Sequence, residues 1–317
     1  MKGIVKNINH FLSEHYFLRF HYKPSILCFL MHKIYPSRSD VKPENGTVSE
    51  GITKAQFETF VLFFKRRDFK FIDETDILSG NLNPQDKYVY LTFDDGYYNN
   101  FSAVEILNKY KAKATFYITT NHCKEGKNYW WDVLYKNRTL QNHSREEIDK
   151  EVKHFYTLHW KEQEDILFRK FGADAIRPDN DLMRPMNPEE LKRFAENKSV
   201  CLGNHTHNHL NLSIYSSHEI KDSLQEARNF LGSVTDQKIN SIAYPYGLFT
   251  DATIDVISSL DYAIGHTCIA HKNYLDDLQM FRFRRISVSG FFDIEAQCRN
   301  HYMNFSLFHH LKNKLKN

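Results

Sequence analysis

Short apolar segments alternate with helix-like segments along most of this 317-residue chain, and no other feature limits its fold as strongly. We expect strands at 25–31, 87–93, 114–118, 200–203, 241–244, 262–268 and 284–288, and helices at 100–109, 188–197, 217–231 and 251–260. Thr53 and Gln56 have the spacing of a capping box, so another helix should begin there. Such alternation is typical of a parallel sheet, either open or closed into a barrel. Catalytic groups in these folds lie just beyond the C-terminal ends of the strands.

Three segments stand apart from this pattern. Residues 1–22 have the apolar spacing of an amphipathic helix, and the basic segment 291–317 is also expected to be helical. The α/β domain would then span residues 23–290. Within it, residues 122–185 are charged and helical in tendency, and we interpret them as an insertion that covers one mouth of the domain. The two ends suggest peripheral membrane contact as a partner interaction, with packing on the protein's own domain as the alternative.

Charge and cysteine content exclude several functional classes. The net charge of +3 is too small to indicate nucleic-acid binding. The five cysteines contain no CxxC pair, which is typical of reduced thiols in a cytoplasmic protein. The first residues lack the apolar core of a signal peptide, and the strongest apolar run, 26–31, is far shorter than the roughly 20 residues of a membrane span. We therefore expect a cytoplasmic protein.

Two adjacent carboxylates, Asp94 and Asp95, follow the strand expected at 87–93, in the sequence TFDDG. Ionised carboxylates at the end of a buried strand need partners or a metal ion. Gly96 allows the chain to turn sharply directly after them. An Asx-type turn that caps the following helix is an alternative explanation of the pair.

Two histidines, His205 and His209, follow another expected strand, in the sequence GNHTHNHLNL. On a helical turn this spacing would direct both imidazoles the same way, so that they could share a metal ion. Roughly one such pair is expected by chance in a chain of this composition, so the position of the pair carries more weight than its spacing. One carboxylate and two imidazoles make a three-ligand site with open positions, as in hydrolytic metal centres, and the second carboxylate could act as a base.

Three motifs together, TFDDG, GNHTHNH and AYPYG, resemble the first three motifs of the NodB-homology polysaccharide deacetylases, carbohydrate esterase family 4, and occur in that family's order. The resemblance extends from about Ile26 to Val288. It is strongest to the branch whose general-acid histidine lies near the N-terminus, here in LMHKI. It implies an α/β fold, an incomplete (β/α)7 barrel with a helical insertion. It also implies a divalent metal cofactor, with Zn²⁺ as the first choice and Co²⁺ or Ni²⁺ as alternatives.

The resemblance also implies the roles of individual residues. The metal ligands would be Asp95, His205 and His209. Asp94 would be the general base, and His32 would be the general acid that protonates the leaving amine.

Two further residues would support the reaction. The backbone N–H of Tyr246, in the third motif, would bind the oxyanion. Arg285 would orient the base, because Ala243 stands where many family members carry an arginine. Within the insertion, Trp130, Trp131 and Asp132 could form a sugar-stacking lip, but we favour plain packing.

The implied reaction is removal of an N-acetyl group from an amino sugar in a glycan, with release of acetate. An O-acetyl esterase, a deformylase and a cyclic-imide amidohydrolase remain alternatives that would use the same site. A non-catalytic carbohydrate-binding protein is an alternative of another class, but the intact set of two aspartates and two histidines argues against it. The sequence indicates neither the particular sugar nor the oligomeric state.

Overall fold

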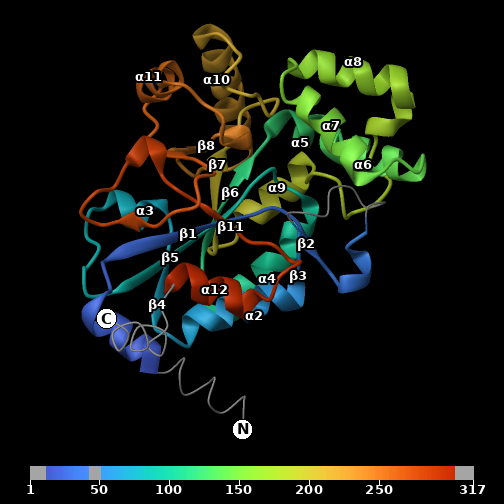
Figure 1. The fold of residues 1–317 in the computed structure, drawn as a ribbon. Coiled ribbons are helices and arrows are strands. Elements are labelled where there is room, and N and C mark those ends of the chain that lie inside the picture. The colour runs from blue at the N-terminus through green and yellow to red at the C-terminus, as the bar shows by residue number, and fades with distance from the viewer. Residues whose placement is uncertain (1–11, 43–50, 304–317) are drawn as a thin grey trace, which may run out of the picture.

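A curled, largely parallel sheet forms the centre of the protein in this computed structural model, which describes residues 12–42 and 51–303 (Figure 1). The main path of the sheet has the order β10-β1-β5-β6-β7-β8-β9, with β11 paired to β1 and β4 paired to β5. Its strands are β1 (Ser25–Met31), β4 (Phe69–Ile72), β5 (Lys87–Phe93), β6 (Ala114–Ile118), β7 (Val200–Asn204), β8 (Ser241–Ala243), β9 (Ile264–His266), β10 (Asn273–Tyr274) and β11 (Ile286–Ser287). Only β10 is antiparallel to its neighbour among the pairings of this sheet in the described chain. A separate pair joins β2 (Ile34–Tyr35) to β3 (Ile52–Thr53).

The two ends of the curled sheet meet along a short seam. Phe283 forms a parallel bridge with His266 at the end of β9. Shortly after this bridge the same segment becomes β11, which pairs with β1. The sheet therefore curls almost into a closed ring, which confirms the expected incomplete (β/α)7 barrel.

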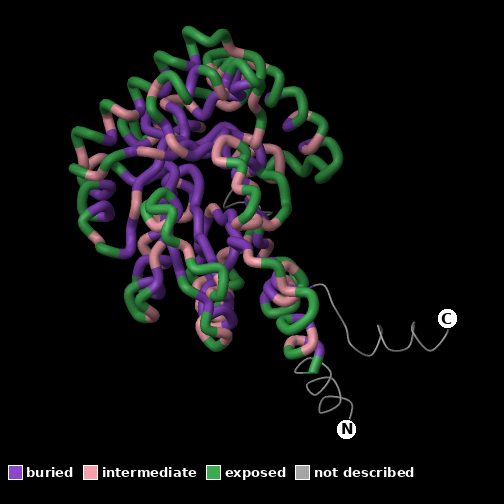
Figure 2. Tube along the Cα trace, turned by 90° about the vertical axis from the view of Figure 1, so that its left-hand side faces the viewer, coloured by how far each residue is buried: buried purple, intermediate pink, exposed green. Residues whose placement is uncertain are grey.

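Helices surround the sheet on its outer face. Helices α2, α4 and α12 pack together on one side, and α9, α10 and α11 cover another side (Figure 1). The strands are buried and the outer turns of the helices are exposed (Figure 2). The helices are α2 (Lys54–Lys65), α3 (Glu74–Leu78), α4 (Phe101–Tyr110), α5 (Thr120–Glu125), α6 (Trp130–Leu140), α7 (Arg145–Phe155), α8 (Trp160–Phe171), α9 (Pro188–Ala195), α10 (Ser217–Val234), α11 (Asp251–Ser259) and α12 (Ile294–Tyr302).

The helix predicted from the capping box is α2. The backbone N–H of Gln56 donates to Thr53 Oγ1 at 3.2 Å, and Gln56 Oε1 accepts from the backbone N–H of Thr53 at 2.9 Å. The apolar face of α2 is buried on the sheet, where the ring of Phe60 lies 4.8 Å from that of Phe29 in β1. The local capping signal and the burial of one helical face therefore agree.

Some elements differ from the sequence expectations. We predicted neither β4 nor α3, because a four-residue strand and a five-residue helix are too short for a periodic signal. Helix α2 ends at Lys65. Asp68 has a φ of 57°, which is not helical, and β4 begins directly after it. Strands expected at 262–268 and 284–288 shorten to β9 and β11.

Residues 120–176 form helices α5 to α8 and a final 3-10 turn (Ala173–Ile176), and α6, α7 and α8 gather at one corner of the molecule (Figure 1). These helices have a small core of their own, which includes Trp130, Leu134, Phe155 and Leu167. Within the expected insertion 122–185, the part up to residue 176 is therefore mostly helical and packs partly against itself, whereas residues 177–185 form no helix.

The N-terminal helix is described from residue 12 and ends at residue 20. Phe17 packs edge-on against Tyr302 of α12 at 5.8 Å, so this helix lies near the start of β1 and away from the strand ends that carry Asp94. Residues 1–11 and the basic positions beyond Met303 lie outside the described residues, so peripheral membrane contact stays a prediction. Among the described residues, no helix has the length and hydrophobicity needed to cross a membrane.

Candidate active site

One carboxylate and two imidazoles converge where β5 and β7 end. Asp95 Oδ1 lies 3.5 Å from His205 Nε2 and 3.4 Å from His209 Nε2. The ligand atoms that these three side chains offer all lie within 4.8 Å of one another, and all three residues are buried. We predicted this group because the C-terminal ends of parallel strands lie at the same edge of a sheet.

The loop that carries the two histidines is not helical, so the geometric reason that we gave for their spacing is wrong. Thr206 and His209 have φ values of 63° and 53°, in the left-handed region. The loop is held by side chains: Asn204 Oδ1 accepts from the Thr206 N–H at 2.7 Å, and Thr206 Oγ1 accepts from the Leu210 N–H at 3.0 Å. The imidazoles converge because of this irregular loop and not because of a helical turn.

The donor atoms of this cluster fit a divalent metal ion. Asp95 Oδ1 is buried and has no hydrogen-bond partner among the residues that the structure describes. His205 Nδ1 lies 2.8 Å from the carbonyl oxygen of Ala243, an arrangement that fixes the ring and directs Nε2 toward Asp95. Burial alone would raise the pKa of Asp95, but the two imidazoles hold it well below its usual value. Burial lowers the pKa of His209 to about 4, so its ring is neutral, as a metal ligand must be.

Asp94 forms a buried two-point ion pair with Arg285. The guanidinium donates from Nη1 to Oδ1 at 2.7 Å and from Nη2 to Oδ2 at 2.8 Å. Arg285 also donates to the carbonyl oxygen of Thr267 at 3.0 Å, and its side chain has no exposed surface. Burial raises the pKa of Asp94, but Arg285 and then His205 reverse this effect and hold the pKa below its usual value. The structure thus places Arg285, from the strand segment that closes the barrel, directly against the expected base.

His32 follows β1, the strand next to β5. Met31 pairs with Phe93 in parallel register, and the Asp94 N–H donates to the Met31 carbonyl at 3.0 Å. The carbonyl oxygen of His32 accepts from Asn100 Nδ2 at 2.7 Å, and the His32 side chain lines the same cavity as Asp94 and Asp95. His32 therefore lies on the strand beside that of Asp94 and faces the same cavity.

Tyr246 lies in the loop after β8 with a left-handed φ of 59°. Its ring stands edge-on to His209, with centroids 4.5 Å apart. Gly247 follows with a φ of 70°, and a side chain there would clash with Cys268, because an added Cβ would lie 2.8 Å from Cys268 Cβ. The third motif therefore brings Tyr246 to the edge of the metal-ligand group.

The start of α6 contacts three of the segments that carry candidate site residues, and we did not predict these contacts from the sequence. Tyr129 Oη donates to the Asp95 carbonyl oxygen at 2.6 Å. Trp130 Nε1 donates to Tyr246 Oη at 2.8 Å. The Trp131 ring lies 4.6 Å from the ring of His209. Trp130 is buried, at 5% exposed, whereas Trp131 lines the cavity.

A cavity of about 680 Å³ is lined by six of the seven candidate residues. Its size falls in the ordinary range for small-molecule sites. The barrel supplies one wall, and helices α6 and α7 supply the other, with Trp131, Tyr135, Arg145, Val152, Lys153 and Tyr156. All seven residues proposed from the sequence come together here, because Asp94, Asp95, His32, His205, His209 and Tyr246 line the cavity and Arg285 lies against Asp94.

Comparisons with known proteins identify one family. The sequence model of the polysaccharide deacetylase family matches residues 81–265, more than half of the chain. This range includes Asp94, Asp95, His205, His209 and Tyr246, whereas His32 and Arg285 lie outside it. The YxkH protein of Bacillus subtilis (strain 168) is 20% identical over 271 residues, which cover 84% of this chain and 73% of that protein.

Solved structures show the same fold. The deacetylase PplD of Streptococcus pyogenes, solved in complex with acetate, has a TM-score of 0.60 at 18% identity and covers 88% of this chain and 99% of its own. IcaB from Ammonifex degensii has a TM-score of 0.60 at 15% identity and covers 87% of this chain and 97% of its own. The chain therefore belongs to the polysaccharide deacetylase family, the NodB-homology group of carbohydrate esterase family 4.

Proposed function

We propose that this protein is a metal-dependent hydrolase that removes the N-acetyl group from an amino sugar of a glycan and releases acetate. One observation carries the proposal. The buried group of Asp95, His205 and His209 lies next to Asp94, which Arg285 holds in place, and both face one cavity. A ligand group beside a separate, oriented carboxylate is the arrangement that metal-assisted amide hydrolysis requires.

The metal would be held by Asp95, His205 and His209. Two imidazoles and one carboxylate are typical ligands of catalytic zinc, so Zn²⁺ is our first choice, with Co²⁺ or Ni²⁺ as alternatives. When bound, such a cation would polarise the acetyl carbonyl and lower the pKa of a water molecule from about 15.7 toward about 7.

Asp94 would accept the proton of the attacking water. Its pairing with Arg285 keeps the carboxylate ionised and fixes the direction of both oxygens. Each carboxylate oxygen has more than one lone pair, so an oxygen bonded to the guanidinium can still accept a proton from water. Arg285 would therefore orient the base without blocking it.

His32 and Tyr246 would complete the reaction. The amine of an amide is a poor leaving group, and protonation of its nitrogen by a positioned side chain typically contributes about 10²–10⁴ in rate. His32 would donate this proton from the strand beside Asp94. The backbone N–H of Tyr246 would donate a hydrogen bond to the developing oxyanion.

Product analysis tests the proposal. Metal-loaded protein would be incubated with N-acetylated sugars and oligosaccharides, and the products analysed by mass spectrometry and by an acetate assay. We expect loss of one acetyl group and an equal amount of acetate, both absent with Asp94→Asn. Turnover of O-acetylated, formylated or cyclic-imide substrates alone would replace the proposal with the corresponding alternative. The absence of turnover on all of these substrates would favour a binding protein.

A further inference from the structure

A buried ion pair joins the insertion to the residue next to His32. Lys33 Nζ lies 2.5 Å from Asp132 Oδ1, and the two side chains are 2% and 0% exposed. Asp132 Oδ2 accepts a second hydrogen bond from Tyr97 Oη at 2.8 Å, and Tyr97 Oη in turn accepts from Trp131 Nε1 at 2.9 Å. The network thus connects the end of β1 with the first turn of α6.

Stability alone does not account for such a pair. Removing two charges from water is costly, and well-packed neutral residues in place of a buried pair are often as stable or more stable. Burial by itself would lower the pKa of Lys33, but the Asp132 carboxylate reverses this effect and raises it, so the lysine stays charged. The location of the pair, between the insertion and the segment after β1, points to a different role.

The segment that carries His32 is held at three consecutive residues. The His32 carbonyl accepts from Asn100 Nδ2 at 2.7 Å, and the Ile34 N–H donates to Asn99 Oδ1 at 3.0 Å. Between these two contacts, the Lys33 side chain is held by Asp132. The asparagines follow β5 and belong to the barrel, whereas the contact with Asp132 comes from the insertion. A displacement of about 1 Å can cost about 10²-fold in rate, so the position of this segment matters for an acid at residue 32.

We propose that Lys33 and Asp132 are positioning residues, and that their ion pair fixes His32 in the cavity and so makes the helical insertion part of the catalytic apparatus. The inference rests on the proposed function, in which His32 protonates the leaving amine. Asp132 acts through Lys33 and does not touch the reacting atoms.

The double variant Lys33→Met/Asp132→Asn tests the inference. It removes both charges together, so no unpaired buried charge remains to unfold the protein. Asparagine at position 132 can still accept the hydrogen bond from Tyr97. We expect normal metal content and a folded protein, with turnover of an unactivated N-acetyl sugar reduced roughly tenfold or more. Hydrolysis of an activated acetyl ester, whose leaving group needs no proton, should fall much less, as it should in His32→Ala.

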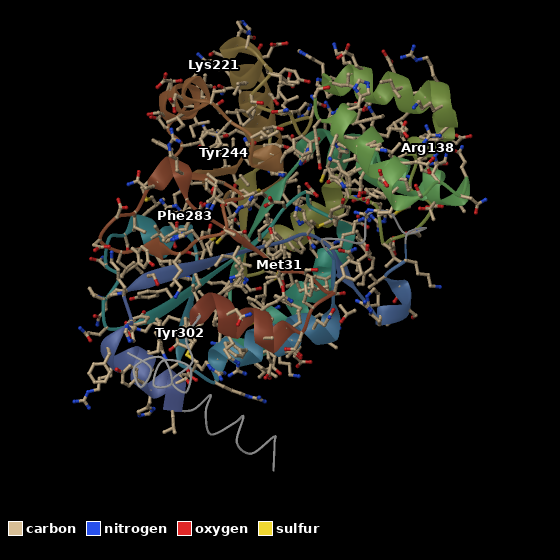
Figure 3. The ribbon with its side chains drawn as sticks, viewed as in Figure 1. Met31, Arg138, Lys221, Tyr244, Phe283 and Tyr302 are labelled. Carbon is tan, nitrogen blue, oxygen red and sulfur yellow. The ribbon has the colours of Figure 1, made fainter. Side chains whose placement is uncertain are left out.

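Hydrogen exchange gives a second readout that does not depend on activity. Amides of residues 32–35 should exchange roughly tenfold faster in the double variant, while those within β1 stay protected. The control is Arg138→Met/Glu151→Gln, which also removes one positive and one negative charge, from a partly buried pair that joins α6 to α7 with N–O distances of 2.7 and 2.9 Å. Glu151 pairs with the more exposed Lys170 as well. Arg138 lies out on the insertion, away from Met31 (Figure 3). The control should keep the wild-type ratio of amide to ester turnover and the wild-type exchange at 32–35.

The possible outcomes separate the two hypotheses. Wild-type amide turnover and wild-type exchange at 32–35 in the double variant would overturn the inference. Equal losses on amide and ester, accompanied by loss of metal, would also overturn it, because the pair would then have only a structural role. If the wild-type protein releases acetate from no N-acetyl sugar, the proposed function fails. The exchange at 32–35 would then decide whether the pair holds this segment at all.

Discussion

We predict that Glu74 gives the protein a pH-dependent stability that can be measured apart from its chemistry. The side chain is 2% exposed at the start of α3, where Ser241 Oγ donates to its carboxylate. Burial raises the pKa of Glu74 from 4.5 to about 7, because the ionised form loses its hydration. The hydrogen bonds from Ser241 and from the Asn240 backbone oppose this effect only in part, and the neighbouring Asp73 carboxylate adds to it.

The direction of the effect on stability follows from the two pKa values. Below about pH 4.5 the side chain is protonated in both the folded and the unfolded chain, so it costs nothing. As the pH rises toward 7, the unfolded chain releases this proton while the folded chain keeps it, and the free energy of unfolding falls. The difference between 4.5 and about 7, at about 1.36 kcal/mol for each pH unit, amounts to about 3 kcal/mol. Above about pH 7 the loss is complete and stays constant.

The variant Glu74→Gln should remove this loss, because an amide does not titrate and can still accept a hydrogen bond from Ser241. Urea unfolding, followed by circular dichroism at several pH values, would give the free energy of unfolding of both proteins. We expect the variant to gain about 2–3 kcal/mol relative to wild type between about pH 5 and about pH 8. Glu196→Gln, at an exposed position, serves as the control. Its free energy of unfolding, plotted against pH, should run parallel to that of wild type. If the free energy of unfolding of Glu74→Gln also ran parallel to that of wild type across this pH range, the reasoning would be refuted.

Three predictions concern the active site itself. His205→Ala should lose the bound metal in elemental analysis, and full occupancy in both this variant and His209→Ala would contradict the ligand assignment. Asp94→Asn should keep the metal but lose nearly all turnover. If this variant lost the metal instead, Asp94 would be the ligand and Asp95 the base. Tyr129→Phe removes the hydrogen bond to the Asp95 carbonyl and should weaken metal affinity about 10–100-fold in a chelator competition assay, and unchanged affinity would argue against this support.

The elements best predicted from the sequence are the strands buried on both faces. The predicted bounds of 87–93 and 114–118 are those of β5 and β6, because a continuous apolar run can be buried only in the centre of such a sheet. Strand β4 was missed and β11 was predicted too long. Both are short, and the neighbouring strands, rather than their own residues, determine where their pairing stops. The topology alone predicted that Asp94, Asp95 and the two histidines would lie at the same edge of the sheet.

The orientation of the site residues could not be predicted in the same way. The His205/His209 loop owes its shape to Asn204 and Thr206, whose side chains replace backbone hydrogen bonds that a helix would have made. The role of residues 129–132 was missed because their partners are far away in the sequence, 34 residues for Tyr129 and 99 for Asp132. A run of three aromatic residues before an aspartate was the only local signal.

The insertion contacts residues of the candidate site whose backbone is strained. Asp95, His209 and Tyr246 all have left-handed φ values, of 77°, 53° and 59°. Such conformations cost on the order of 1–3 kcal/mol for each non-glycine residue and persist only where the surroundings enforce them. Tyr129, Trp130 and Trp131 each contact a different one of these three residues. The barrel places these loops at one edge, and the start of α6 supplies contacts to their strained residues, so we expect the geometry of the proposed metal ligands to depend on the insertion as well as on the motifs.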